Sequence, residues 1–187
     1  HDKGYETTVN LMAVSIVNDR ELEQAIELLA KSEATTIYVV DSFGALYSEQ
    51  ADFLLDMYLG HARANGKSVG MHAHNNQQLA FANTIEAIIK GANMLDASMA
   101  GLGRGAGNCP LELLIGFLKN PKFNLRPVLK CIQNHVLPLD GQMEWGPRIP
   151  YMVTALLNQH PRAAIQMRQG EDRDDFVAFY DQMVEEE

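Results

Sequence analysis

The first 120 residues alternate short apolar runs with longer amphipathic stretches. The short runs are rich in β-branched residues, and the stretches between them repeat apolar residues at helical spacing. This pattern predicts four strands, at 7–15, 35–42, 68–74 and 93–101, and four helices, at 18–32, 48–66, 78–90 and 110–120. The strands read as continuous apolar runs, which is typical of parallel strands covered on both faces.

The strands recur at nearly constant intervals. Val9, Ile37, Val69 and Met94, one from each strand, are 28, 32 and 25 residues apart, and a (β/α)₈ barrel averages about 31 residues per unit. The sequence therefore predicts a parallel α/β fold of about four βα units, which form either half of a TIM barrel or a small doubly wound sheet.

Helix ends are marked by residues with known capping preferences. Asn18 or Asp19 is expected to cap the first helix and Ser48 the second, because their side-chain oxygens accept hydrogen bonds from the first free N–H groups. Gly66 follows the end of the second helix, and Pro110 is expected in the first turn of the fourth.

Beyond residue 120 the pattern becomes helical. Further helices are predicted at 124–137, 149–160, 162–169 and 172–186, and no strand pattern occurs among them. The expected domain organisation is a partial (β/α) barrel over 1–120 and a helical C-terminal region over 121–187.

Composition excludes several classes of partner. The formal net charge is −9, so no basic surplus is available to neutralise nucleic-acid phosphates or an acidic membrane. No apolar run reaches the 18 residues of a membrane span. The two cysteines show no paired metal or redox spacing, which favours a reducing, cytoplasmic location.

Two histidines end the third predicted strand. His72 and His74, in "GMHAHNNQQ", are separated by one residue, so on a strand both side chains point to one face, about 6.6–7 Å apart. Two imidazoles at that spacing can share a metal ion, since metal–nitrogen bonds are about 2.0–2.1 Å long. The alternative is a pair of histidines that only hydrogen-bond to backbone near a turn.

A glycine-rich segment follows the fourth predicted strand. In "AGLGRGAGNCPLE" (100–112), four glycines alternate with other residues, which allows close approach to a ligand and positive φ angles. The alternative is an ordinary tight turn.

Taken together, "HAHNN" and "DASMAGLGRGAGNCPLE" resemble the DRE-TIM metallolyases, the HMGL-like family of metal-dependent aldolases and acyl transferases. Within it the resemblance is strongest to 4-hydroxy-2-oxovalerate aldolases, in which a "DS-x-G" strand end, here Asp41–Gly44, also precedes the histidine strand. The likeness covers residues 5–118 and extends loosely into "IPYMVTALLNQHPRAA". It implies that the four βα units are half of a TIM barrel.

The resemblance also implies roles for individual residues. His72 and His74 would bind a divalent ion, Mn²⁺ first, with Mg²⁺, Co²⁺ or Zn²⁺ as alternatives, and Asn108 would be a further ligand or lie just outside the ligand shell. Ser42 would bind the carboxylate of a 2-oxo acid. Tyr151 would be a catalytic residue near the substrate, or a helix residue that only packs on the barrel.

The implied activity is divalent-metal-dependent aldolase or lyase chemistry on a small 2-oxo acid such as pyruvate. Asp96 would orient a metal-binding histidine or be a structural residue only. An aldehyde dehydrogenase partner is also implied. The Arg-Asp pair and nearby histidine of the family's first strand have no match here, and the sequence starts at His1 rather than Met. We therefore expect the natural chain to begin upstream, and this chain alone to be inactive.

Two other functions fit part of the pattern. Amidohydrolases also place such a histidine pair at a strand end of a TIM barrel, but on the first strand, and further histidines and an aspartate follow on later strands. Here one strand follows, without a histidine. The other alternative is a non-catalytic half-barrel scaffold that forms a homodimer through its open sheet edges.

Overall fold

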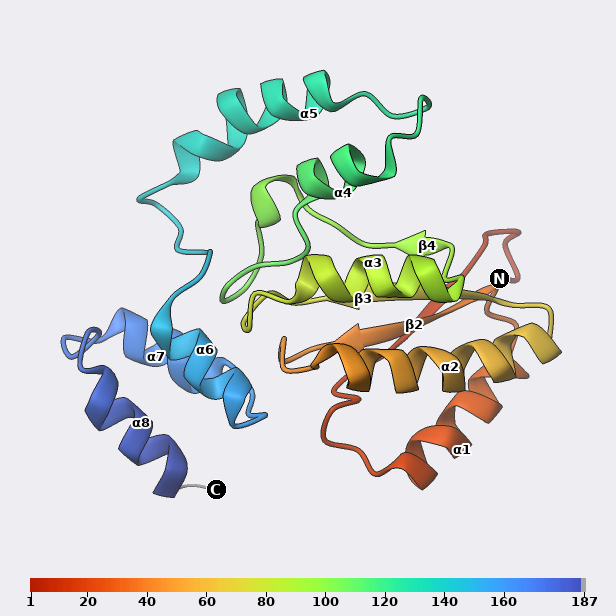
Figure 1. The fold of residues 1–187 in the computed structure, drawn as a ribbon, viewed down its shortest axis with the longest axis horizontal. Helices are drawn as coiled ribbons and strands as arrows, with labels where there is room; N and C mark the ends of the chain where they lie inside the picture. The colour runs from red at the N-terminus through yellow and green to blue at the C-terminus, as the bar shows by residue number, and fades with distance from the viewer. Residues whose placement is uncertain (186–187) are drawn as a thin grey trace. The chain divides into compact units, whose positions relative to one another are not determined.

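The structure of the chain, a computed structural model, describes residues 1–185 as two compact units (Figure 1). The first unit consists of residues 1–42, 46–73 and 82–96. The second consists of residues 43–45, 74–81 and 97–185.

The first unit is a parallel sheet with alternating helices, as predicted. Its elements are β1 (Thr8–Leu11), α1 (Asp19–Ala30), β2 (Thr36–Asp41), α2 (Ser48–Ala64), β3 (Ser68–Ala73), most of α3 (Ala80–Lys90) and β4 (Met94–Leu95). The strands are hydrogen-bonded in the order β1-β2-β3-β4 and all pairs are parallel. Val9, Ile37 and Val69 lie opposite one another, and Met94 lies opposite Gly70.

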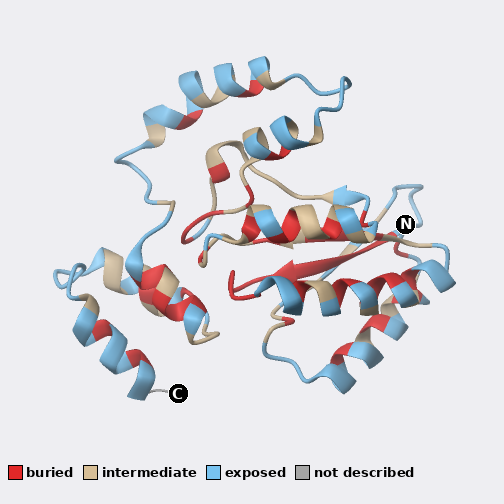
Figure 2. Cartoon of the chain, viewed as in Figure 1, coloured by how far each residue is buried: buried red, intermediate tan, exposed pale blue. Residues whose placement is uncertain are grey.

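The core of this unit lies between the sheet and its helices. Every residue of β2 is buried, and β3 is mostly buried, as Figure 2 shows. Leu22 and Ile26 of α1 and Leu55 and Tyr58 of α2 are at most 1% exposed. Burial of these large apolar side chains is the main favourable term that holds the helices to the sheet.

All four strands are shorter than predicted, and in the first and fourth predicted ranges a residue with positive φ interrupts the extended backbone. Ala13, inside the expected 7–15 strand, has a φ of 56°, and Ala100, inside the expected 93–101 strand, has a φ of 54°. Positive φ values are incompatible with an extended strand. β1 therefore ends at Leu11, and Met99–Gly101 forms a 3₁₀ turn, η1.

The predicted caps are partly confirmed. The Asn18 side chain accepts a hydrogen bond from the Glu21 N–H at 3.0 Å, as expected. Ser48 is not a cap residue, because α2 already begins at Ser48; instead the Tyr47 N–H donates to the Gln50 side chain at 2.9 Å. Pro110 immediately precedes the fourth helix rather than lying within it.

Short helices make up most of the second unit. They are α4 (Leu111–Leu118), α5 (Leu125–Cys131), the π-helical turn η2 (Ile132–Val136), the 3₁₀ turn η3 (Leu137–Leu139), α6 (Ile149–Leu156), α7 (Arg162–Gln169) and α8 (Phe176–Glu185). The helix predicted at 172–186 begins later because the Asp175 side chain accepts a hydrogen bond from the Ala178 N–H; residue 186 lies outside the described residues.

The apolar core of the second unit joins α6, α7 and α8. Tyr151 and Val153 pack with Ala164, Phe179 and Met183. Among residues 1–185 no helix is both long enough and apolar enough to cross a membrane. The domain boundary near residue 120 and the cytoplasmic location stay predictions.

Candidate metal centre

His72 is held by a carboxylate at the end of the sheet. It lies in β3, opposite Val40, and its Nδ1 is 2.9 Å from Oδ2 of Asp96, which follows β4. A carboxylate against Nδ1 favours the tautomer with the proton on that nitrogen, so Nε2 is the nitrogen that a metal would use. The contact is the one that an orienting role of Asp96 would require, and the role itself stays a prediction.

Tyr38, which the sequence analysis missed, also contacts Asp96. It is a buried residue of β2 whose hydroxyl hydrogen-bonds to the Asp96 carboxylate, and burial together with that carboxylate raises the pKa of Tyr38 to about 12. Its ring lies over Gly70, where an added Cβ would be 2.5 Å from the ring carbons Cε1 and Cζ. The glycine therefore makes room for the ring. The parallel register places Tyr38 opposite Gly70, and this register is the signal from which the Tyr38–Gly70 contact could have been predicted.

In the second unit, His74 pairs with the glycine-rich segment 101–108. His74 and Asn108 form an isolated antiparallel bridge. Next to it, the Asn75 N–H donates to the Gly107 carbonyl at 2.8 Å. The structure therefore brings together two of the three predicted metal ligands through their backbones.

The Asn108 side chain has one unused oxygen. Its Nδ2 donates to the Leu102 carbonyl at 3.1 Å and to the Ser98 hydroxyl at 3.4 Å. Its Oδ1 is buried and has no hydrogen-bond partner among residues 1–185. A side-chain amide oxygen is a normal ligand for a hard divalent cation, so this unpaired oxygen fits the predicted metal role.

Ser42, the predicted substrate-binding residue, is buried in the first unit directly after β2. Its Oγ accepts a hydrogen bond from the Ala13 N–H at 2.8 Å. A serine hydroxyl can accept one hydrogen bond and donate another, and a carboxylate requires a donor, so the residue type suits the predicted role.

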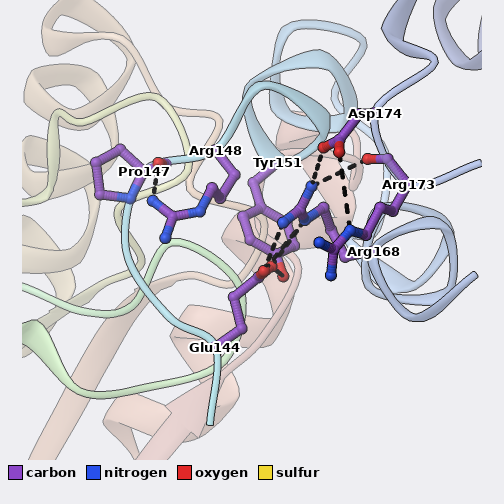
Figure 3. A network of polar contacts seen from close by, with 7 residues as sticks. All are labelled: Glu144, Pro147, Arg148, Tyr151, Arg168, Arg173 and Asp174. Atoms are coloured by element: carbon purple, nitrogen blue, oxygen red, sulfur yellow. Dashed lines mark hydrogen bonds and ion pairs between the residues drawn. The ribbon is translucent and has the colours of Figure 1, made fainter. Parts of the chain in front are cut away.

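Tyr151 belongs to a charged network in the second unit that is centred on Glu144 and Arg168 (Figure 3). Its hydroxyl donates to Oε1 of Glu144 at 3.0 Å, and Arg168 donates to both Glu144 oxygens, the shortest contact being 2.7 Å. Arg168 also donates to the Asp174 carboxylate at 2.8 Å. Sequence reasoning missed this network, because its charged residues are far apart in the chain and follow no motif.

The environment of Tyr151 keeps its proton in place. The side chain is buried, and burial first, then the Glu144 carboxylate, raises the pKa of Tyr151 to about 12. The Arg168 guanidinium in turn lowers the pKa of Glu144 below its usual value. A cavity of about 210 Å³ lies beside the network and is lined by Arg104, Gly105, Glu144, Tyr151, Ile165, Arg168 and Gln169.

Residues 1–134, which include the whole sheet, both histidines and the glycine-rich segment, match the HMGL-like family. The chain belongs to the HMGL-like family. Over 117 residues this HMGL-like chain is 37% identical to oxaloacetate decarboxylase of Mycobacterium tuberculosis (strain ATCC 25618 / H37Rv), covering 63% of this chain and 34% of that protein. Over 145 residues it is 30% identical to 4-hydroxy-2-oxovalerate aldolase of Shewanella halifaxensis (strain HAW-EB4), covering 75% of this chain and 42% of that protein.

The fold similarity covers nearly the whole HMGL-like chain. The N-terminal domain of a Bacteroides vulgatus protein assigned as an aldolase superposes with a TM-score of 0.70 at 27% identity, over 95% of this chain and 59% of that one. The predicted fold class, a (β/α) half of a TIM barrel followed by helices, is confirmed. The chain spans about a third to two fifths of the curated relatives it matches, 34% of one and 42% of the other.

Proposed function

We propose that the protein is a divalent-metal-dependent carbon–carbon lyase that acts on a small 2-oxo acid, and that His72, His74 and Asn108 of this chain hold the ion, with Mn²⁺ as the first candidate. The observation that carries the proposal is the buried Oδ1 of Asn108, which has no hydrogen-bond partner among residues 1–185 and lies on a backbone segment paired with His74. The one-residue separation of His72 and His74 adds a second imidazole from the same strand end.

A bound divalent ion would supply a Lewis acid for the carbonyl and carboxylate of the 2-oxo acid. The residues of the chain would do the rest. Asp96 orients the His72 imidazole through Nδ1, and Ser42 donates its hydroxyl proton to the substrate carboxylate. Tyr151 holds a proton on a hydroxyl of raised pKa, next to a cavity large enough for a small acid.

With only these three proposed ligands, the chain is expected to bind a metal ion weakly. Two imidazoles and one amide are all neutral ligands, whereas Mn²⁺ and Mg²⁺ prefer carboxylate oxygens. Among residues 1–185 no group of three His, Cys, Asp or Glu side chains is arranged to hold a metal. We therefore propose that the 187-residue chain alone has no lyase turnover, although the full protein has it.

Manganese binding by the purified chain tests the ligand assignment. Free Mn²⁺ gives an electron paramagnetic resonance signal that weakens on binding, so the signal measures affinity directly. The His72→Ala and His74→Ala variants should each weaken binding about tenfold or more. His135→Ala, which removes an exposed histidine of η2, is the matched control and should leave the affinity unchanged.

Two results would contradict the proposal. One is wild-type chain that leaves the manganese signal unaltered at millimolar protein; the other is an equal loss of affinity in His135→Ala. The proposed absence of lyase turnover is tested separately, by assaying oxaloacetate decarboxylation and cleavage of 4-hydroxy-2-oxovalerate with manganese present. Turnover by the chain alone would show that its own residues are sufficient.

The sheet edge supports a second candidate role. β1 is the terminal strand of the described sheet, and Met12 and Ile16, which follow it, are largely exposed. A second copy of the chain could cover this edge, as the scaffold alternative requires. Light scattering coupled to size-exclusion chromatography would detect the dimer, and the same column run with an aldehyde dehydrogenase would test that predicted partner.

A further inference from the structure

Asn76 connects three loops of the second unit. It is 3% exposed and lies just after β3. Its Nδ2 donates to the Phe43 carbonyl at 2.8 Å, in the loop after β2. Its Oδ1 accepts from the Ala106 N–H at 3.0 Å, in the glycine-rich segment 101–108. Both ends of this buried amide are therefore used, each by a different loop.

The backbone on either side of Asn76 binds the same two loops. The Asn75 N–H donates to the Gly107 carbonyl, and the Gln77 N–H donates to the Gly44 carbonyl at 3.1 Å. The side-chain bonds of Asn76 thus continue a run of backbone bonds that begins at the pairing of His74 with Asn108.

Two glycines allow the loops to approach this amide. A Cβ on Gly44 would lie 2.6 Å from the Asn76 backbone nitrogen, and a Cβ on Gly105 would lie 2.9 Å from Asn76 Oδ1. Both glycines have positive φ, +59° and +64°. The close approach and the φ angles together explain why these positions require glycine.

We propose that Asn76 is a positioning residue, which holds segment 101–108 in the register that places Asn108 opposite His74. The proposal rests on the proposed metal-binding function of those two residues. Phe43 offers an acceptor and Ala106 a donor, and a side-chain amide satisfies both at once. Aspartate lacks the donor and alanine lacks both, so neither can hold the two loops together.

Two measurements on the 187-residue chain test this role. Hydrogen exchange followed by mass spectrometry reports on the peptide that contains 101–108, and manganese paramagnetic resonance reports on affinity. In Asn76→Ala we expect exchange in that peptide to rise about two- to tenfold, because one hydrogen bond is lost. We expect manganese affinity to fall about tenfold, as when other supporting residues of metal sites are removed.

The neighbouring asparagine provides a matched control. The Asn75 side chain accepts a hydrogen bond from the Ala80 N–H at 3.2 Å, at the start of α3. Asn75→Ala should loosen that helix end while leaving exchange in 101–108 and manganese affinity unchanged. Equal exchange in the two alanine variants would overturn the proposal, and so would faster exchange in Asn76→Ala without any loss of affinity.

A second pair of variants covers the case in which Asn76→Ala does not fold. Gly105→Ala disturbs the same contact from the side of the glycine-rich segment, and Gly141→Ala, also at positive φ but with nothing within 4 Å, controls for backbone strain alone. Gly105→Ala should weaken manganese binding and Gly141→Ala should not. If the wild-type chain binds no manganese, the proposed function fails, and exchange in 101–108 alone then decides whether Asn76 holds the segment.

Discussion

Replacing Gly70 by alanine should destabilise the chain, although alanine is normally better tolerated than glycine. The new Cβ would lie 2.5 Å from two carbons of the Tyr38 ring, far inside contact distance. Tyr38 is 6% exposed, and its hydroxyl bonds to Asp96. The ring therefore has little free space to move into, and any shift pulls it away from Asp96.

The size of the effect follows from two opposing terms. Overpacking a well-filled core costs about 1–3 kcal/mol, while the smaller conformational freedom of alanine in the unfolded chain returns about 0.4–1 kcal/mol. We expect a net loss of about 1–2 kcal/mol in the free energy of unfolding. Gly60→Ala is the matched control, because Gly60 lies in α2 and an added Cβ would meet no neighbouring atom within 4 Å in the described part of the chain. It should instead stabilise the chain by about 0.5–1 kcal/mol.

Urea unfolding followed by far-ultraviolet circular dichroism measures both variants. The midpoint should fall for Gly70→Ala and rise for Gly60→Ala, with similar slopes against urea. Manganese affinity should also fall in Gly70→Ala, because a displaced Tyr38 no longer holds Asp96 in place. A Gly70→Ala chain as stable as the wild type would refute the reasoning, since it would mean that the ring is free to move.

Three further predictions concern the two polar networks. Asp96→Asn should weaken manganese binding about 10- to 100-fold, because the carboxylate that orients His72 is lost; unchanged affinity in the resonance assay would contradict this. Glu144→Gln should lower the pKa of Tyr151 from about 12 toward its ordinary value, with burial keeping part of the shift, as measured by ultraviolet titration of tyrosinate with Tyr151→Phe as the blank. Arg168 lowers the pKa of Glu144 in the folded chain. The ion pair therefore contributes its full stability above the ordinary glutamate pKa of about 4.3. That contribution is lost as the pH falls through the lowered pKa that Glu144 has in the folded state. Thermal melts between pH 6 and 3 should therefore show a steeper acid loss for wild type than for Glu144→Gln.

The fold was largely predictable because it depends on periodic burial. The intervals between apolar runs gave the parallel units, and Val9, Ile37 and Val69 proved to be true register partners. The end of β1 and the 3₁₀ turn after β4 were not predictable, because Ala13 and Ala100 have positive φ there. Alanine carries no sequence signal for that conformation, which the surrounding hydrogen bonds impose.

The candidate site was predictable only where its residues are close in sequence or belong to a motif. His72, His74 and Asn108 were proposed in this way, and their metal role stays a prediction. Tyr38 was missed because its contact with Asp96 depends on strand order, which brings together residues from β2 and from the end of β4. The partner of Tyr151 was missed for a similar reason, because Glu144 lies in a loop that no periodicity describes.

The energetics of the glycine-rich segment favour a ligand site over a simple scaffold. A buried amide oxygen without a hydrogen bond costs about 1–3 kcal/mol, and Asn108 Oδ1 is such an atom among residues 1–185. Gly103 adds to the case. A Cβ there would lie 2.4 Å from Asn108 Nδ2, so position 103 must lack a side chain if the amide is to stay in place. A segment that served only to cover a sheet edge would gain stability from a side chain that fills the space or completes its hydrogen bonds. Retaining an unpaired oxygen beside the His74 backbone is explained if a cation supplies the missing partner, since the cation then offsets the cost of burial.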